Sequence, residues 1–108
     1  MGIALDQRLV DEIVRRICGT TQPDRIILFG SAAMGRMTRD SDIDVLVLHP
    51  NPGNTRDACV RIGDALRGLG YAFDVLVMAT ERFEESKDVI GGIAYPVNRT
   101  GQVIDAAA

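Results

Sequence analysis

Hydrophobic residues form two kinds of pattern along the chain, and each pattern predicts one type of element. Apolar residues recur every three or four positions over 5–18 and 55–69, which predicts two amphipathic helices. Short apolar runs over 25–29, 43–49 and 71–78 predict three buried strands. Arg15 and Arg16 are expected to lie on the solvent-exposed face of the first helix.

The last third of the chain has a less regular pattern. Thr80 is predicted to cap a helix that extends to Lys87. The stretch 88–98 is expected to be helical in part, with Pro96 limiting the helix. A short edge strand is expected over 102–104.

The lengths of the connections predict how the strands pair. The helix over 55–69 is long enough for a crossover, so the strands 43–49 and 71–78 should run parallel. The strands 25–29 and 43–49 are expected to pair as antiparallel neighbours. The fold class is therefore α/β (or α+β), with a small mixed sheet flanked by helices.

Length and composition predict one soluble domain. The chain has 108 residues, so a single domain over 1–108 is expected, with its core over about 24–104. The net charge of −3 argues against a broad nucleic-acid-binding surface. No apolar run reaches the length of a membrane span and no signal pattern begins the chain, so a cytoplasmic location is expected. Cys18 and Cys59 lack metal-ligand spacing and are expected to be free thiols.

Two aspartates stand at the start of the central apolar run. Asp42 and Asp44 are two positions apart, so on a strand their carboxylates would project together. Bringing two carboxylates together is costly unless a cation offsets the repulsion. Hard oxygen ligands beside bound phosphates suit Mg²⁺. The structural alternative is that Ser41-Asp42 is a turn with its own side-chain hydrogen bonds and that Asp44 is a solvent-facing strand residue.

Gly30-Ser31 follows the preceding apolar run and would lie at the same edge of the sheet. Glycine lets the backbone approach a phosphate closely, serine adds a hydroxyl, and the segment 31–37 is expected to form a short helix or a turn. A phosphate cradle next to a pair of carboxylates is the outline of a phosphoryl- or nucleotidyl-transfer site.

Asp74 is the third candidate, because it is one acid within an otherwise apolar run. If the strands 43–49 and 71–78 are parallel, their early residues lie side by side, and Asp74 approaches Asp42 and Asp44. An exposed acid at the edge of the sheet is the alternative. His49 is expected to end its strand at the surface, with no ligand cluster nearby.

Gly30-Ser31, a ten-residue interval and Asp42-x-Asp44 before an apolar strand resemble the signature of the nucleotidyltransferase superfamily that includes DNA polymerase β. The short chain is most similar to the minimal nucleotidyltransferase (MNT) branch, the antitoxins of HEPN/MNT toxin–antitoxin pairs. The resemblance implies a palm-like fold and a third acid, which Asp74 matches.

The resemblance also implies a mechanism. Asp42, Asp44 and Asp74 would be catalytic ligands of two Mg²⁺ ions, Gly30 and Ser31 would bind the β- and γ-phosphates, and ATP would be the substrate. The implied reaction is transfer of AMP to a hydroxyl of a HEPN-type RNase toxin, with the chain forming a homo-oligomer or a hetero-oligomer with that toxin. Neither membrane attachment nor direct nucleic-acid binding is expected.

One departure from the resembled pattern leaves other functions open. The family often has arginine where this chain has Met34, and Arg36 lies two residues further on. Arg36 and Arg39 either contact triphosphate or partner, or are solvated loop residues. The alternative functions are a non-catalytic antitoxin that acts by contact, and a transferase for a small aminoglycoside-like molecule.

Overall fold

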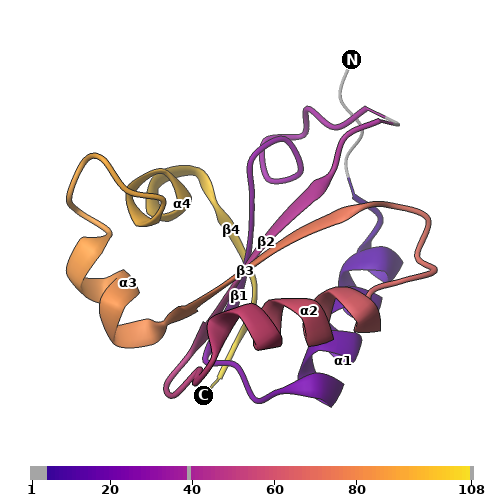
Figure 1. Cartoon of the computed structure of the whole chain (residues 1–108). Coiled ribbons are helices and arrows are strands. Elements are labelled where there is room, and N and C mark those ends of the chain that lie inside the picture. The colour runs from indigo at the N-terminus through magenta and orange to yellow at the C-terminus, as the bar shows by residue number, and fades with distance from the viewer. Residues whose placement is uncertain (1–4, 39, 108) are drawn as a thin grey trace.

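The computed structural model describes residues 5–38 and 40–107 (Figure 1). Within this part of the chain the elements are α1 (Gln7–Thr20), β1 (Arg25–Phe29), β2 (Ile43–His49), α2 (Thr55–Ala65), β3 (Phe73–Ala79), α3 (Thr80–Ser86), α4 (Ala94–Thr100) and β4 (Gln102–Ala106). None of the helices described here combines the length and apolar character needed to cross a membrane. Cys18 and Cys59 are both free thiols.

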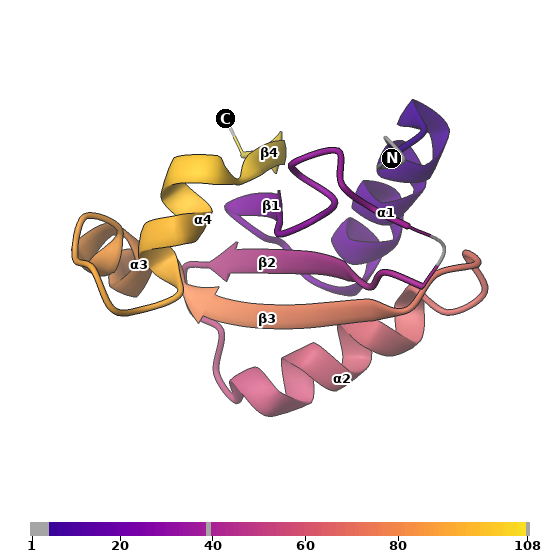
Figure 2. The same cartoon turned by 90° about the horizontal axis from the view of Figure 1, so that it is seen from above.

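The strands form one mixed sheet in the order β3-β2-β1-β4, as Figure 2 shows from above. β1 pairs antiparallel with β2 and β4, whereas β2 and β3 run parallel, as the connection lengths predict. β2 lies inside the sheet and is buried over most of its length. The prediction of a small mixed sheet flanked by helices is confirmed.

The two faces of the sheet are covered by different helices (Figures 1 and 2). α1 and α2 cover one face, where the larger core cluster lies; its helical members include Ile13, Ile17 and Ile62. α3 and α4 pack on the other face, through Phe83, Ala94 and Val97 against Ile27, Leu46 and Leu48. This second cluster is the smaller one.

α1 spans Gln7–Thr20, whereas the predicted range was 5–18, and one of its arginines has a different role from the one expected. The side chain of Asp6 accepts a hydrogen bond from the backbone N–H of Arg8 and caps the helix. Arg16 is only partly exposed, because its guanidinium donates to the carbonyl oxygens of Ala65 and Arg67, at 3.2 and 2.7 Å. The expectation that Arg16 lies on the solvent-exposed face is therefore wrong. Arg16 instead ties α1 to the end of α2 by satisfying carbonyls at a helix terminus.

Two further boundaries differ from the sequence pattern. α2 ends at Ala65, whereas the apolar pattern predicted a helix to Leu69. The pattern continues past the helix because the side chains of Leu66 and Leu69 still pack on the core. The Thr80 hydroxyl does not cap α3, whose N-cap is Ala79; it donates to Asp24 Oδ2 at 2.5 Å and so joins α3 to β1.

α4 contains the proline that was expected to limit it. Pro96 is the third residue of this helix, and α4 begins at Ala94 and continues to Thr100. Proline is tolerated there because the N–H groups of a first helical turn have no partner within the helix. The edge strand β4 is longer than predicted and ends at Ala106.

Replacing Gly101 with alanine is expected to destabilise the fold by about 2 kcal/mol, a typical cost of overpacking. A Cβ at this position would collide with the Val97 carbonyl oxygen and lie 2.8 Å from Cγ2 of Ile27. The control is Gly63→Ala in α2, where a Cβ meets nothing within 4 Å. This control should gain about 0.5–1 kcal/mol from helix propensity. Urea unfolding of both variants would measure the difference, and equal stabilities would contradict the steric argument.

Candidate active site

Three acidic residues gather where β2 and β3 begin. Asp44 and Asp74 are register partners on these parallel strands. Asp42 comes two residues before Asp44, and the adjoining Ile43 N–H donates to the Ala72 carbonyl at 2.9 Å. Asp44 is half-buried, whereas the other two acids are exposed. The structure thus brings together the three acids that the sequence singles out, at one edge of the sheet.

The alternation of strand side chains shows which face carries these carboxylates. Asp44 alternates with residues of the larger core cluster and shares its face with Leu46 and Leu48. On β3, Asp74 similarly shares its face with the partly buried Leu76. Both acids therefore lie on the face that α3 and α4 cover, at the end where the strands start.

The charges at this edge are unbalanced. Burial raises the pKa of Asp44, and the negative charges of Asp74 and Asp42 raise it further. No ion pair in residues 5–38 or 40–107 joins any of the three acids to a basic side chain. A cation placed here would relieve this repulsion.

Metal-free protein should show this repulsion in its stability. Because the folded pKa of Asp44 is raised above 3.8, the folded state holds this proton to higher pH than the unfolded chain does. The contribution of Asp44 to the free energy of unfolding is therefore greatest below pH 3.8, and it falls as pH rises through the raised pKa. In EDTA, Asp44→Asn should be more stable than the native protein, by a margin that grows as pH rises from 3.8 towards neutrality. Urea unfolding across this range checks the trend, and a constant difference would contradict it.

The glycine-serine connection lies directly beside these acids. Phe29, the last residue of β1, pairs with Asp44, so Gly30 follows at the same edge. Gly30 has φ of 67°, and a Cβ there would collide with Oδ2 of Asp44. Glycine is thus required twice, for its backbone conformation and for the close approach of the carboxylate.

The segment after Gly30 is a turn, which settles the choice between a helix and a turn. The Met34 N–H donates to the Gly30 carbonyl at 3.3 Å, and the Arg36 N–H donates to the Ser31 carbonyl at 2.9 Å. No α-helix forms over 30–37, so a helix N-terminus for phosphate is not present here. The groups that residues 30 and 31 can offer a phosphate are therefore the amides and the hydroxyl of this turn. Met37 is fully buried and anchors the end of the segment in the core.

Hydrogen bonds between Thr38 and Ser41 form a turn directly before the acids, and the sequence suggested a turn with its own side-chain hydrogen bonds at Ser41 only as an alternative. Ser41 Oγ accepts from the Thr38 N–H at 2.9 Å and lies 3.1 Å from Thr38 Oγ1. The Ser41 N–H donates back to the Thr38 carbonyl at 3.1 Å. This pair fixes the backbone immediately before Asp42. Two hydroxyl residues three positions apart before an acid were the available signal.

The fit of this site to magnesium is partial. The donor set consists of carboxylate oxygens, which is the chemistry that Mg²⁺ prefers. However, no group of three or more histidine, cysteine or acidic side chains within the described ranges is arranged so that it could hold a metal ion. Joint coordination by the three acids therefore requires side-chain rotation.

The remaining candidates of the sequence lie around the turn. Met34 is 45% exposed, and Arg36 is exposed as well. Neither side chain has a hydrogen-bond or ion-pair partner in the described part of the chain. Arg39 lies outside the described residues.

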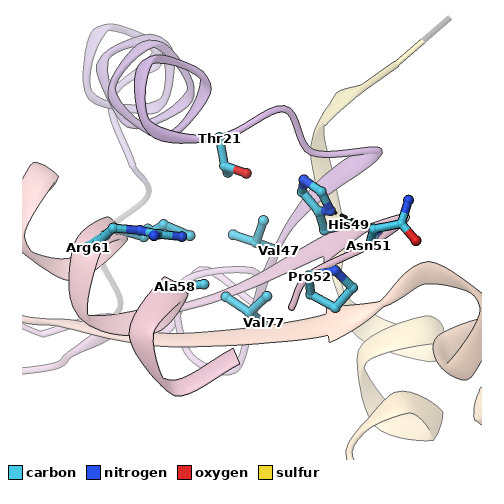
Figure 3. Close-up of a pocket in the computed structure, with 9 residues that line it drawn as sticks. Thr21, Val47, His49, Asn51, Pro52, Ala58, Arg61 and Val77 are labelled. Atoms are coloured by element: carbon cyan, nitrogen blue, oxygen red, sulfur yellow. Dashed lines mark hydrogen bonds between the residues drawn. The ribbon is translucent and has the colours of Figure 1, made fainter. Parts of the chain in front are cut away.

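A small cavity lies elsewhere in the molecule, at the end of β2 opposite the acids (Figure 3). It has a volume of about 100 Å³ and is lined by residues that include Val47, His49 and Arg61. The candidate active site is instead an open edge of the sheet.

Comparisons with known proteins agree with this arrangement. The nucleotidyltransferase domain family matches residues 10–95. No curated protein matches the chain. Among solved structures, a toxin–antitoxin with AMP-PNP is similar with a TM-score of 0.69 and 22% identity, covering 91% of this chain and 73% of that chain.

Two other solved structures are similar. A tri-AMPylated Shewanella oneidensis HEPN toxin in complex with an MNT antitoxin matches with a TM-score of 0.61 and 18% identity, over 95% of this chain and 74% of that chain. A putative nucleotidyltransferase from Sulfolobus solfataricus matches with a TM-score of 0.56 and 26% identity, over 75% of this chain and 73% of that chain. These likenesses agree with the fold. Because the family match spans most of the sequence and includes β1, β2 and β3, the chain belongs to the nucleotidyltransferase domain family.

Proposed function

We propose that this protein is a Mg²⁺-dependent adenylyltransferase that transfers AMP from ATP to a hydroxyl of a partner protein, and that the partner is a HEPN-type toxin. The observation that carries the proposal is the pairing of Asp44 with Asp74 beside the Gly30 turn. Nucleotidyl transfer requires groups that hold metal ions and groups that position the triphosphate, and the carboxylates and the glycine-containing turn at this sheet edge could supply both. The family match supports the same reaction class.

The residues of this edge have distinct tasks in the proposed reaction. Asp42, Asp44 and Asp74 would hold magnesium, which when bound supplies charge neutralisation on the triphosphate and activates the acceptor hydroxyl. The Gly30 and Ser31 amides and the Ser31 hydroxyl would donate to the β- and γ-phosphate oxygens. The exposed Asp74 would accept the proton of the acceptor hydroxyl. The oxygen of that hydroxyl attacks the α-phosphorus, and pyrophosphate leaves.

The acceptor is proposed from the structural neighbours. One neighbour contains an AMPylated HEPN toxin bound to an MNT antitoxin, and another contains AMP-PNP. A third is a variant MntA–HpeT toxin–antitoxin in which two aspartates, two positions apart, are replaced by glutamates. The spacing of those aspartates equals that of Asp42 and Asp44. Modification of a HEPN partner at a hydroxyl fits all three.

A second function has one observation in its favour. Met34 occupies the turn position where similar proteins often carry arginine, and its exposed side chain offers no charge to a triphosphate. A contact-only antitoxin needs no such charge. This reading predicts that neutralisation of the toxin survives loss of the acids.

The test is incubation with α-labelled ATP, Mg²⁺ and a candidate HEPN-type partner protein. The native protein should label the partner, and the double variant Asp42→Asn, Asp44→Asn should not. Asp88→Asn is the matched control, because this exposed acid lies in the α3–α4 connection. A stable complex formed equally by the native and double-variant proteins, without label from either, would overturn the transferase proposal and establish the contact-only reading.

A further inference from the structure

The pocket at the far end of β2 has an apolar floor (Figure 3). Val47 on β2, Val77 on β3 and Ile62 on α2 supply this floor. Its volume of about 100 Å³ is well below that of pockets that enclose drug-sized ligands, which are roughly 300–1,000 Å³. A nucleotide does not fit, so any ligand of this pocket is a small one.

The upper part of the pocket carries hydrogen-bond donors. The Nδ1 atom of His49 accepts the backbone N–H of Asn51 at 2.9 Å. In the neutral imidazole the proton is therefore on Nε2, which is a donor. Figure 3 shows the His49 ring, the Thr21 hydroxyl and the Arg61 side chain around the same space. Within the described ranges, neither Thr21 nor Arg61 has a side-chain hydrogen-bond partner.

Arg61 adds a positive charge that nothing in the described part of the chain neutralises. Some other arginines are engaged, Arg16 and Arg25 with glutamates and Arg67 with Asp64 at 3.2 Å, whereas the exposed Arg61 has no ion pair among the described residues. No carboxylate lines the pocket. The guanidinium fork and the imidazole N–H can only donate, and the Thr21 hydroxyl and the Asn51 amide can donate as well. Donors that include a cation and face no carboxylate favour an oxyanion.

We propose that this pocket is a second ligand site, which binds a small oxyanion: inorganic phosphate or a short-chain carboxylate. Arg61 and His49 donate to the anion, and the apolar floor accommodates a short alkyl group when the anion is a carboxylate. His49 lies five positions beyond Asp44 on β2, about 16 Å at the usual strand rise. The site is therefore separate from the candidate active site, and its test does not depend on nucleotidyl transfer.

The chain has a single histidine, so His49 can be observed without ambiguity. Sodium phosphate and sodium acetate are titrated separately into the full chain at constant pH and ionic strength, with chloride as the balancing salt, while NMR records the imidazole ring protons. We expect a saturable shift with at least one of the two anions, and the anion that saturates identifies the class. Arg61→Gln should weaken that binding about tenfold, as expected for loss of a charge-assisted hydrogen bond.

Arg56→Gln is the matched control, because Arg56 is an exposed arginine of the same helix that does not line the pocket. It should bind the anion as the native protein does. A shift that never saturates with either anion, or one that Arg61→Gln leaves unchanged, would overturn the proposal. The amide spectrum of each variant shows whether it is folded, and Thr21→Val provides a second variant should Arg61→Gln fail to fold.

Discussion

Asp44→Asn is expected to reduce AMP transfer by about a thousandfold, which corresponds to several kcal/mol of lost transition-state stabilisation. Asp44 is the half-buried member of the three acids and the register partner of Asp74. Asparagine keeps its shape but removes the charge that would hold the cation. Single-turnover transfer of labelled AMP, at saturating ATP and Mg²⁺, measures this effect directly.

The same substitution should leave the fold intact or make it more stable. The pKa of Asp44 is raised by burial and by its acidic neighbours, so its ionised form is disfavoured in the folded state. Activity and stability are thus expected to change in opposite directions at neutral pH. A variant that lost activity and also unfolded more easily would indicate that Asp44 has a structural role instead.

Magnesium itself should produce a matching effect on stability. Binding to the folded state alone raises the melting temperature, so the native protein should gain thermal stability with added Mg²⁺. Asp44→Asn should gain much less, whereas Asp88→Asn, an acid in the α3–α4 connection, should gain as much as the native protein. Thermal unfolding at several Mg²⁺ concentrations distinguishes these outcomes. An equal gain in all three proteins would mean that magnesium binds elsewhere.

The sequence predicts the sheet and the convergence of the acids because both follow from local rules. Short apolar runs identify β1 and β2, a period of 3.6 identifies α1 and α2, and a crossover helix sets β2 and β3 parallel. Once these strands are parallel, their early residues lie close together, and the register observed in the structure makes Asp44 and Asp74 partners. The i, i+2 spacing of Asp42 and Asp44 needed no tertiary information either.

What the sequence does not predict depends on contacts between distant segments. The sequence predicts that Arg16 is a surface residue of α1, yet its guanidinium donates to two carbonyl oxygens at the end of α2. Thr80 reads as a helix cap, yet its hydroxyl reaches Asp24, more than fifty positions earlier in the chain. In each case a partner outside the local window decides the role, and periodicity carries no information about that partner.

The pocket around His49 and Arg61 shows that functional residues, too, can depend on contacts between distant segments. His49 was expected to end a strand at the surface, and it does lie at the end of β2. Its place beside Arg61 depends on how α2 packs against the sheet, which no spacing in the sequence states. A lone histidine and an exposed helical arginine look ordinary until the fold brings them together.

Gly30→Ala is expected to lower AMP transfer by about a hundredfold, the usual cost of displacing a reacting group by an ångström. The new Cβ would collide with the Asp44 carboxylate, which must then leave its place beside the turn. The backbone adds strain of about 1–2 kcal/mol, because alanine tolerates positive φ poorly. Steady-state transfer and urea unfolding are both measured.

Gly35→Ala separates these two effects. Gly35 lies at the end of the same turn with φ of 66°, nearly the same as the 67° of Gly30, but a Cβ there meets nothing within 4 Å. Both variants should therefore lose similar stability, and only Gly30→Ala should lose most of its activity. Equal losses of activity would assign the effect to strain in the turn. Unequal losses would show that the free approach of the Asp44 carboxylate to Gly30 is what the reaction requires.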